Sequence, residues 1–500
     1  MTALWLLVGR KRSNQRRRTV ANKLLTATLE DGSTIQYDPE VIGEGGMKRV
    51  HFTPDRKSVV CFFKDASVGA DPQRRARLQS IVGLFNPTTD SEVGAYWREL
   101  FCWPTGIVTK PELGVVAPTY AANFFFAQEP FKGKEKQASW FTSPKLRRFL
   151  PPQELGDWRR YIHISTRLAR AVRRMHLAGL AHSDLSNRNV LIDPQTGTAV
   201  IIDIDSLVVP RIYPPDVLGT PGYIAPEVLT TQDLELTDPN RNLPSMLTDR
   251  HALAVLIYEY LLGRHPLRGP KVNSTQSAEE DERLSMGERA LWIENPNDTS
   301  NRPKDPNYMH APYTVTGPYL APLFVRAFVE GLHNPDARPD AGEWERALVK
   351  TTDLLYPCPN PNCLSRWFAF ESTHKQCPWC DTVINEQVAV LHFYREGNRG
   401  QFKNDNARLV VYHHQRLFAW HIYDNQYAGE RADRTPKAYF ALQNGHCWLV
   451  NQSNEPMVVV AGSHIANKLL PLSEGEVLRN GSQIRLARAA HGRLAVVQMV

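Results

Sequence analysis

The stretch HSDLSNRNVLIDPQTGTAVIIDIDSL, residues 182–207, constrains this chain more than any other. Asp184 stands two residues after a histidine, Asn189 follows five residues later, and Asp203 comes directly after the apolar run AVII. Transfer of a phosphoryl group to a hydroxyl requires one carboxylate facing that hydroxyl and an Asn/Asp pair for magnesium. The ordered set therefore predicts a phosphate-handling site.

Two further parts of such a site have candidates upstream. The segment IGEGGMKRV lies between two strand-like runs, so Gly43, Gly45 and Gly46 can bring backbone N–H groups close to phosphate. Lys64 closes the run VVCFFK and is the candidate cation for the phosphates. Taken alone, the glycines are also compatible with an ordinary hairpin turn, and the lysine with a solvated surface charge.

The hydrophobic pattern changes along the chain from strand-like to helical and back. The first part contains short β-type runs, including the alternating segment TATLEDGSTIQY, whereas Ile162, Leu168, Val172 and Met175 fall on one face of a helix that starts near Trp158. A second helical block is HALAVLIYEYLLG, and strands return beyond residue 388. With 500 residues, the chain is expected to form an α+β protein of two to four domains.

The net charge of +7 comes mostly from the first twenty residues, which hold six Lys and Arg and no acid. The rest is nearly neutral, so nucleic acid is not expected as a partner except through this basic tail. The opening apolar run is too short for a membrane span and precedes its charges, which is atypical of a signal peptide. We therefore expect no membrane partner and a cytoplasmic location.

Four of the seven cysteines cluster as C-x4-C and C-x2-C, thirteen residues apart. Two tight turns that each project two thiolates make a tetrahedral zinc site, and four protein ligands make it a structural one. The alternative is a set of buried, unpaired cysteines. The predicted zinc ligands are Cys358, Cys363, Cys377 and Cys380.

Residues 25–350 resemble a protein kinase of the bacterial, eukaryotic-like type. Besides residues 182–207, GTPGYIAPEVL is similar to the peptide-binding loop and APE sequence of that family, with Glu227 as its glutamate. TDRHALAVLIYEYLLGRHPL places Asp249 where the family has an aspartate that braces the catalytic loop, and NPDARPD supplies Arg338 as the partner of Glu227. The resemblance implies a two-lobed fold with a β-rich N-lobe and a helical C-lobe.

The resemblance also implies roles for individual residues. Asp184 is the expected catalytic base, Asn189 and Asp203 are the expected ligands of Mg²⁺ or Mn²⁺, and Lys64 is expected on the α- and β-phosphates of ATP. Arg188 takes over from a lysine that usually helps at the γ-phosphate, as in tyrosine kinases. Thr220 in GTPGY belongs to a loop type found with serine/threonine specificity.

The lysine's usual glutamate partner has two candidates, Glu92 and Glu99, of which we favour Glu92 for its distance from the next strand. The alternative is that both are merely exposed charges on a helix. Lys48, at the third glycine position, either adds a phosphate contact or faces water. Phe62 stands two residues before Lys64, on the face expected against adenine, so either a bulge turns it away or the nucleotide pocket is unusual.

Two further departures bear on regulation and metal binding. Ser183 replaces the arginine that couples a phosphorylated activation loop to the catalytic loop, so the kinase is expected to be of the non-RD type. Asp205 replaces the glycine of the DFG sequence and is either a further metal ligand or a turn-capping carboxylate, the latter being favoured.

The part from residue 388 to the end resembles the second half of a forkhead-associated (FHA) domain, a β-sandwich that binds phosphothreonine peptides. A sandwich without that activity is the alternative, because the phosphate-gripping arginine and serine are not recognisable. The expected organisation is a basic disordered tail (1–24), a kinase-like domain (25–352, with an N-lobe of about 25–122 and a C-lobe of about 123–352), a zinc ribbon (353–386) and a β-sandwich (387–500).

This architecture resembles the kinase of bacterial phosphorylation triads associated with tellurite resistance. The resemblance implies a stress-response role and two partners, a von Willebrand factor A domain protein and a metal-dependent phosphatase. The predicted function is transfer of the γ-phosphate of Mg-ATP to Ser/Thr hydroxyls of proteins. The alternative is a pseudokinase scaffold that assembles partners through its ribbon and β domain; a small-molecule phosphotransferase is disfavoured by the GTPGYIAPE loop.

Overall fold

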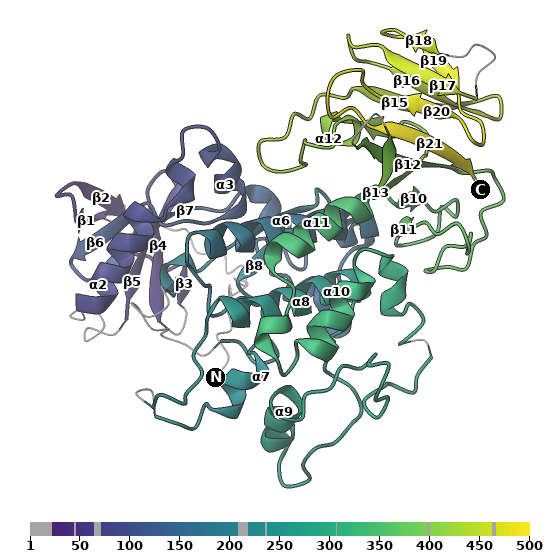
Figure 1. Cartoon of the computed structure of the whole chain (residues 1–500). Helices are drawn as coiled ribbons and strands as arrows, with labels where there is room; N and C mark the ends of the chain where they lie inside the picture. Colours follow the sequence, from purple (N-terminus) through teal and green to yellow (C-terminus); the bar gives the residue numbers. More distant parts are fainter. Residues whose placement is uncertain are drawn as a thin grey trace.

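The computed structural model describes residues 23–44, 47–64, 72–208, 219–235, 238–306, 308–397, 401–462 and 467–500. Figure 1 shows a β-rich part at the N-terminal end of this range, a helical part in the middle, and a second β-rich part at the C-terminus. Gly45, Gly46 and nearly all of the basic tail lie outside the described residues.

The N-terminal part is built on one seven-stranded antiparallel sheet in the order β2-β1-β6-β7-β5-β4-β3. The alternating segment expected as one strand is a hairpin, because Gly32 adopts a φ of 83° in the turn between β1 and β2. This hairpin adds to the far edge of the sheet, beside β6, and the glycine segment forms the opposite edge. The strands are β1 (Leu25–Leu29), β2 (Thr34–Tyr37), β3 (Gly43–Glu44), β4 (Lys48–Phe52), β5 (Ser58–Phe63), β6 (Gly106–Lys110) and β7 (Gly114–Pro118).

Two helices pack beside this sheet, α2 (Pro72–Gln79) and α3 (Gly94–Leu100). Leu78 of α2 joins the buried group formed by one face of the sheet, and the Arg74 guanidinium lies 5.0 Å from the centre of the Phe63 ring. Trp97 of α3 belongs instead to the large core of the helical part. The two helices thus connect the sheet with the rest of the kinase-like region.

The helical part is organised around α6, α8 and α11. The residues predicted on one helix face, Ile162, Leu168, Val172 and Met175, are all buried, which confirms that periodicity. Asp157 caps the N-terminus of α6 by accepting a hydrogen bond from the Arg160 amide. The helices are α4 (Ser139–Thr142), α5 (Pro144–Arg147), α6 (Trp158–Leu177), α7 (Pro226–Thr230), α8 (Met246–Leu262), α9 (Ala278–Met286), α10 (Ala321–Val325) and α11 (Ala341–Thr352).

A two-stranded hairpin, β8 (Val190–Asp193) with β9 (Thr198–Ile201), lies between the sheet and these helices. Short 3-10 or π turns complete the region: η1 (Ser80–Leu84), η2 (Pro87–Thr89), η3 (Ala122–Phe124), η4 (Pro152–Leu155), η5 (Ile204–Ser206), η6 (Tyr313–Thr316), η7 (Arg326–Glu330) and η8 (Pro335–Ala337).

The cysteine-rich segment packs against the helical part on one side and the C-terminal part on the other. It contains one hairpin, β10 (Leu355–Pro357) with β11 (Trp367–Ala369). Its Trp379 ring lies 5.5 Å from that of Trp158 in α6, and its buried residues form one group with Val390 and Val410. The segment is therefore a wedge between its neighbours.

The C-terminal part contains two antiparallel sheets, ordered β13-β12-β21-β20-β17-β18 and β14-β15-β16-β19, with one shared core. Alternate residues of the paired strands face that core, which is the pattern of a β-sandwich. Its elements are β12 (Ala389–Glu396), β13 (Phe402–Val410), β14 (Arg416–Leu417), α12 (Ala419–Ile422), β15 (Ala438–Gln443), β16 (His446–Asn451), β17 (Met457–Ala461), β18 (Lys468–Leu470), β19 (Gly475–Val477), β20 (Gln483–Arg485) and β21 (Leu494–Met499).

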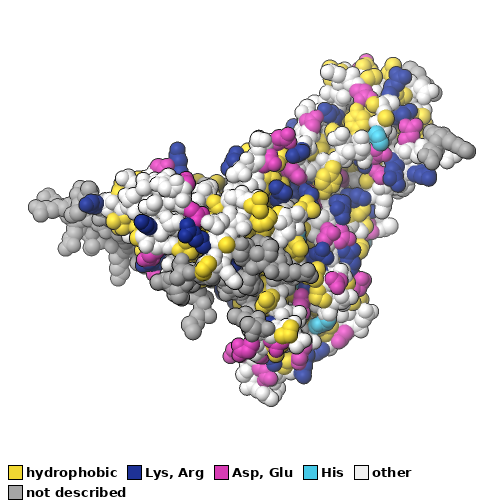
Figure 2. Space-filling view, turned by 60° about the vertical axis from the view of Figure 1, so that its left-hand side comes forward, with side chains coloured by type: hydrophobic (Ala, Val, Ile, Leu, Met, Phe, Trp, Pro, Cys, Tyr) yellow, Lys and Arg dark blue, Asp and Glu magenta, His cyan; other side chains and the backbone are white. Residues whose placement is uncertain are grey.

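Acidic and basic side chains alternate over the face of the molecule shown in Figure 2, in keeping with the near-neutral charge of the chain beyond its tail. None of the helices in the described part of the chain has the length and apolar character needed to cross a bilayer.

Candidate active site

Residues 181–189 form a loop before β8 that is held by a buried carboxylate. Asp249, on the first turn of α8, accepts hydrogen bonds from the His182 amide (2.7 Å) and the Ser183 amide (3.3 Å). The same carboxylate lies 3.1 Å from Nε2 of His176 at the end of α6. Two helices thereby fix the backbone directly before Asp184.

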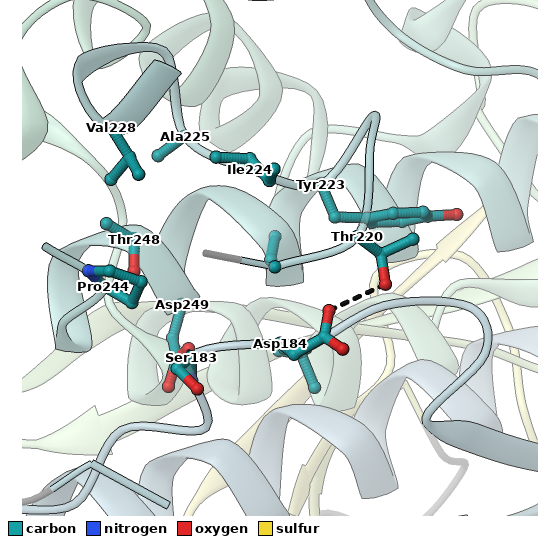
Figure 3. A pocket seen from close by; sticks show the side chains of 13 residues that line it. Ser183, Asp184, Thr220, Tyr223, Ile224, Ala225, Val228, Pro244, Thr248 and Asp249 are labelled. Atoms are coloured by element: carbon teal, nitrogen blue, oxygen red, sulfur yellow. Dashed lines mark hydrogen bonds between the residues drawn. The ribbon is translucent and has the colours of Figure 1, made fainter. Parts of the chain in front are cut away.

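Asp184 sits at the centre of this loop and has a partner on each carboxylate oxygen. The Thr220 hydroxyl donates to its Oδ1 at 2.7 Å, and the Asn189 side-chain amide donates to its Oδ2 and its backbone carbonyl, each at 2.9 Å. Figure 3 shows Thr220 and Asp184 pointing toward one another in the lining of a small pocket. Burial raises the pKa of Asp184 above its usual value, against the lowering effect of the Thr220 hydrogen bond.

Asn189 and Asp203 are connected through the backbone at the two ends of the β8–β9 hairpin. The Ile202 amide donates to the Asn189 carbonyl at 3.0 Å, which brings the residue before Asp203 beside Asn189. Because the Asn189 amide nitrogen is held by Asp184, its side-chain oxygen is left to accept or to bind a cation. Amide and carboxylate oxygens suit magnesium, so these residues fit a Mg²⁺ site.

Asp203 has a left-handed backbone, with φ at 63°, and its carboxylate meets a lysine from the glycine hairpin. Lys48 Nζ lies 2.5 Å from Asp203 Oδ1 and 2.7 Å from Asp205 Oδ1. The Lys48 ammonium holds the pKa of Asp203 below its usual value. Burial alone would lower the pKa of Lys48, but the two carboxylates outweigh it and raise that pKa.

Lys64, the lysine expected at the phosphates, is paired with a residue of the glycine hairpin. Its Nζ is 2.8 Å from Glu44 Oε1 at the edge of the glycine hairpin, in a partly exposed pair. Neither candidate glutamate meets it. Glu92 pairs with Arg431 of the C-terminal part at 3.1 Å, and Glu99 pairs with Arg167 of α6 at 3.3 Å.

Strand alternation explains the difference. Phe62 packs edge-on against Tyr37 and His51, with ring centres 5.2 and 5.7 Å apart, in a buried group that also contains Ala27 of β1. Lys64 continues the strand with the same parity as Phe62. The adenine conflict expected from Phe62 therefore does not arise on the Lys48 side of the sheet, and no bulge interrupts the pairing of β5 with β4 or β7.

The remaining residues predicted for the site are placed as follows. Gly43 is buried and pairs with Val50 in the β3–β4 ladder, Arg188 is exposed next to Asn189, and Thr220 is buried on Asp184. Gly45 and Gly46 lie outside the described residues, so the phosphate cover is described only at its two ends.

Glu227 and Arg338 meet as a bidentate pair. Arg338 Nη1 and Nη2 lie 2.8 and 2.7 Å from the two Glu227 oxygens, and the guanidinium also donates to the carbonyls of Leu247, Gly331 and Leu332. With all its donors used and a side chain 1% exposed, Arg338 ties the loop after residue 219 to α8.

The four clustered cysteines converge in the wedge. Their sulfur atoms all lie within 4.8 Å of one another, with 3.5 Å between Cys358 and Cys380 and 3.9 Å between Cys363 and Cys377. Four thiolates bound to zinc at about 2.3 Å in a tetrahedron are about 3.8 Å apart. The cluster therefore fits a four-thiolate zinc ion, which would have no open position for a reacting ligand.

The comparisons with known proteins agree with this geometry. Residues 129–337 match the family model of the protein kinase domain. The chain is similar to citron rho-interacting kinase of Rattus norvegicus, with 33% identity over 99 residues, which are 19% of this chain and 5% of that protein. It is also similar to the atypical protein kinase C of Drosophila melanogaster (34% over 116 residues, 22% of this chain and 17% of that protein) and to a serine/threonine-protein kinase of Saccharomyces cerevisiae (28% over 114 residues, 21% and 14%).

The chain therefore carries a protein kinase domain, although it spans less than a fifth of the length of each of these relatives. Such a domain uses ATP and a divalent metal ion to modify proteins. The matched segment contains Asp184, Asn189, Asp203 and Thr220, whereas Lys48 and Lys64 precede it. The assignment of the N-terminal sheet to the same fold rests on its strand order and position.

The roles of Lys48 and Asp205 are open from the sequence alone, and the structure brings the two side chains together. The available signal was the parity of the run SVVCFFK. Residues 62 and 64 lie on the same face of the strand, because side chains alternate along it. The bulky Phe62 at the position expected against adenine therefore indicated that Lys64 lies on the sheet face opposite Lys48.

Proposed function

We propose that this protein is an ATP-dependent protein kinase that transfers the γ-phosphate of Mg-ATP to serine or threonine hydroxyls of other proteins. The observation that carries the proposal is the convergence of Asp184, Asn189 and Thr220 at one loop, with Asp203 at the end of the adjoining hairpin. Serine/threonine preference is supported by the Thr220 contact with Asp184 and by similarity to a serine/threonine kinase.

In the proposed reaction the substrate hydroxyl oxygen forms a bond to the γ-phosphorus of ATP while the bond from that phosphorus to the β–γ bridging oxygen breaks. Asp184 accepts the hydroxyl proton, and ADP leaves with the electrons of the broken bond. Asn189 and Asp203 would hold Mg²⁺, which neutralises charge on the phosphate oxygens. Thr220 orients Asp184 from the side opposite Asn189.

Regulation is proposed to differ from that of kinases switched on by loop phosphorylation. Ser183 replaces the arginine that would bind a loop phosphate, and its backbone is already fixed by Asp249 at a φ of 64°. The catalytic loop is thus held in place without a phosphorylated residue.

The test is phosphotransfer by the purified full chain with labelled ATP and Mg²⁺ or Mn²⁺. Wild type should label itself or a generic protein substrate on Ser or Thr, and Asp184→Asn should lower the rate by at least about 100-fold while keeping Mg-ATP binding. The exposed Arg188→Lys variant tests the proposed γ-phosphate contact separately, with a smaller loss expected. Absence of labelling across metals and acceptors, together with no thermal shift on addition of Mg-ATP, would instead support the pseudokinase scaffold.

Partners and zinc are proposed on separate grounds. The four sulfur atoms support one structural zinc ion that holds the wedge. The kinase, wedge and β-sandwich order supports the resemblance to bacterial phosphorylation triads, so a von Willebrand factor A domain protein and a metal-dependent phosphatase are the first partners to test in pull-down and phosphorylation assays.

A further inference from the structure

We infer that Lys48, on β4, is the lysine that contacts the ATP phosphates, in place of a lysine on β5, and that Asp205 is the carboxylate that positions it. The inference rests on the proposed function and concerns which strand supplies the cation. It begins from the contacts of Lys48 Nζ with Asp203 at 2.5 Å and with both oxygens of Asp205 at 2.7 and 3.0 Å.

The register of β4 and β5 defines the face that points to the site. Lys48 pairs with Phe63 and Val50 pairs with Cys61, so these four side chains share one face of the sheet. Lys64 falls on the other face and is bound to Glu44. On the face that carries Lys48, the central residue of β5 in its pairing with β4 is Cys61. Its thiol is neutral, because burial raises its pKa to about 12. Strand β5 thus supplies no cation to this face, and β4 does.

Because the inferred phosphate-binding lysine comes from β4 and not from β5, its carboxylate partner also comes from a different element. Helix α2, which packs on this face through Leu78 and Arg74, has the sequence PQRRARLQ and contains no Asp or Glu. The two glutamates near α3, Glu92 and Glu99, are paired with Arg431 and Arg167. Asp205 is 6% exposed and binds Lys48 through both oxygens, so it can keep the ammonium in place when Asp203 turns to a metal ion. We therefore assign Asp205 the role of positioning the Lys48 ammonium, which differs from both roles expected from the sequence, metal binding and turn capping.

The experiment compares Lys48→Met with Lys64→Met in the full chain, by calorimetric titration with Mg-ATP and by phosphotransfer. Lys48→Met should weaken Mg-ATP binding at least tenfold and lower kcat/KM at least about 100-fold, the scale of losing one preorganised charge contact. Lys64→Met removes a partly exposed pair and should change both within about threefold. The reverse ranking, with Lys64→Met disabled and Lys48→Met normal, would overturn the inference.

Three additional variants extend the test, and the first of them keeps it decisive if Lys48→Met is poorly folded. Lys48→Met/Asp205→Asn removes the cation and one of its carboxylates together, so it should fold like wild type and still lose phosphate binding; normal Mg-ATP affinity in this variant would count against us. Cys61→Lys in the Lys48→Met background returns an ammonium to the same face and should regain at least about tenfold in kcat/KM. For Asp205→Asn, a rise in KM for Mg-ATP larger than the fall in kcat is expected, because the lysine is present but mispositioned.

The calorimetric titration with Mg-ATP distinguishes a failure of this inference from a failure of the proposed function. Wild type that binds Mg-ATP but transfers no phosphate to any acceptor would contradict the kinase proposal, while the Lys48 and Lys64 affinities would still decide which lysine meets the phosphates. Wild type that does not bind Mg-ATP would contradict both.

Discussion

At the scale of single residues, the loop after residue 219 is fixed by two contacts, one ion pair and one hydrogen bond from a tyrosine to a buried carboxyl group. The Arg338–Glu227 pair is ionic and fully satisfied, whereas the Tyr223 hydroxyl donates to Glu259 Oε2 at 2.5 Å in a buried site on α8. Burial raises the pKa of Glu259 from 4.5 to about 7, although the Tyr223 hydrogen bond lowers it in part. Glu259 is therefore a group whose charge state changes near neutral pH.

This pKa shift predicts a pH-dependent stability. The folded chain binds the Glu259 proton more tightly than the unfolded chain, so its contribution is complete below pH 4.5 and is lost as the pH rises through about 7. Glu259→Gln, which resembles the protonated form, should gain in melting temperature relative to wild type between pH 5 and pH 8 and level off above that. The full difference should be on the order of 3 kcal/mol.

The control is Glu282→Gln, which removes an exposed glutamate that pairs with Arg268. Its melting temperature should follow that of wild type at every pH. A Glu259→Gln curve parallel to wild type from pH 5 to 8 would show that Glu259 does not titrate in this range.

At the scale of elements, the cysteine-rich wedge depends on its four sulfur atoms more than on its secondary structure. The β10–β11 hairpin has three residue pairs, too few to be stable without its surroundings. The cluster residues Cys363 and Cys377 are at the same time part of the hydrophobic group that joins the wedge to the β-sandwich. Loss of the proposed zinc ion should therefore loosen both the hairpin and its contact with Val390 and Val410.

We predict about one zinc ion per chain, which Cys377→Ser should release. Hydrogen exchange should then speed up across residues 355–385, and phosphotransfer should fall less than this local protection, because the closed thiolate set holds no reacting ligand. Cys102→Ser is the matched control: its sulfur donates to the Pro118 carbonyl at 3.3 Å, a bond that serine can keep, and it should retain the zinc. Full zinc content in Cys377→Ser would contradict the assignment of the ligands.

At the scale of the whole molecule, the β-sandwich is docked onto the kinase helices by its loop between α12 and β15. Figure 1 shows this loop extending toward α6 and α11. Arg170 of α6 bonds to Glu345 of α11 at 2.6 Å and to the Ala428 carbonyl of the loop, while Arg173 bridges Glu345 and Glu430. Glu345 is fully buried, and its two oxygens lie 2.6 and 2.7 Å from the nitrogens of these two arginines.

We predict that Arg170→Ala destabilises the chain by about 3 to 5 kcal/mol, because it leaves a buried carboxylate with half of its compensation. The same change should raise hydrogen exchange in residues 424–434, since the Ala428 carbonyl loses its donor. Arg431→Ala, which breaks the exposed pair with Glu92 on the same loop, should cost less than about 1 kcal/mol and serves as control. Equal effects of the two changes would mean that the buried cluster does not dock the sandwich.

Many features of this protein could be predicted from the spacing of residues that are close in the sequence. The helix near Trp158 followed from periodicity, since apolar residues three and four apart must share a face. The proximity of Asp184 to Asn189 and that of the four cysteines followed from short spacings, because one loop or two tight turns bring these residues together. The expectation of a protein kinase domain and of helical and β-rich parts is confirmed by the comparisons and the fold.

Features that depend on pairing between distant segments could not be obtained in this way. The role of Lys48 depends on which face of β5 points to Asp203, and a shift of one residue exchanges the two faces without changing the sequence pattern. Arg431, the partner of Glu92, and Ala428, one of the partners of Arg170, come from a loop more than 250 residues away. The wedge shares its core with strands that no local signal connects to it. Residue type and local spacing therefore determine which side chains are candidates for the site. Strand register and domain packing determine which of these side chains come into contact.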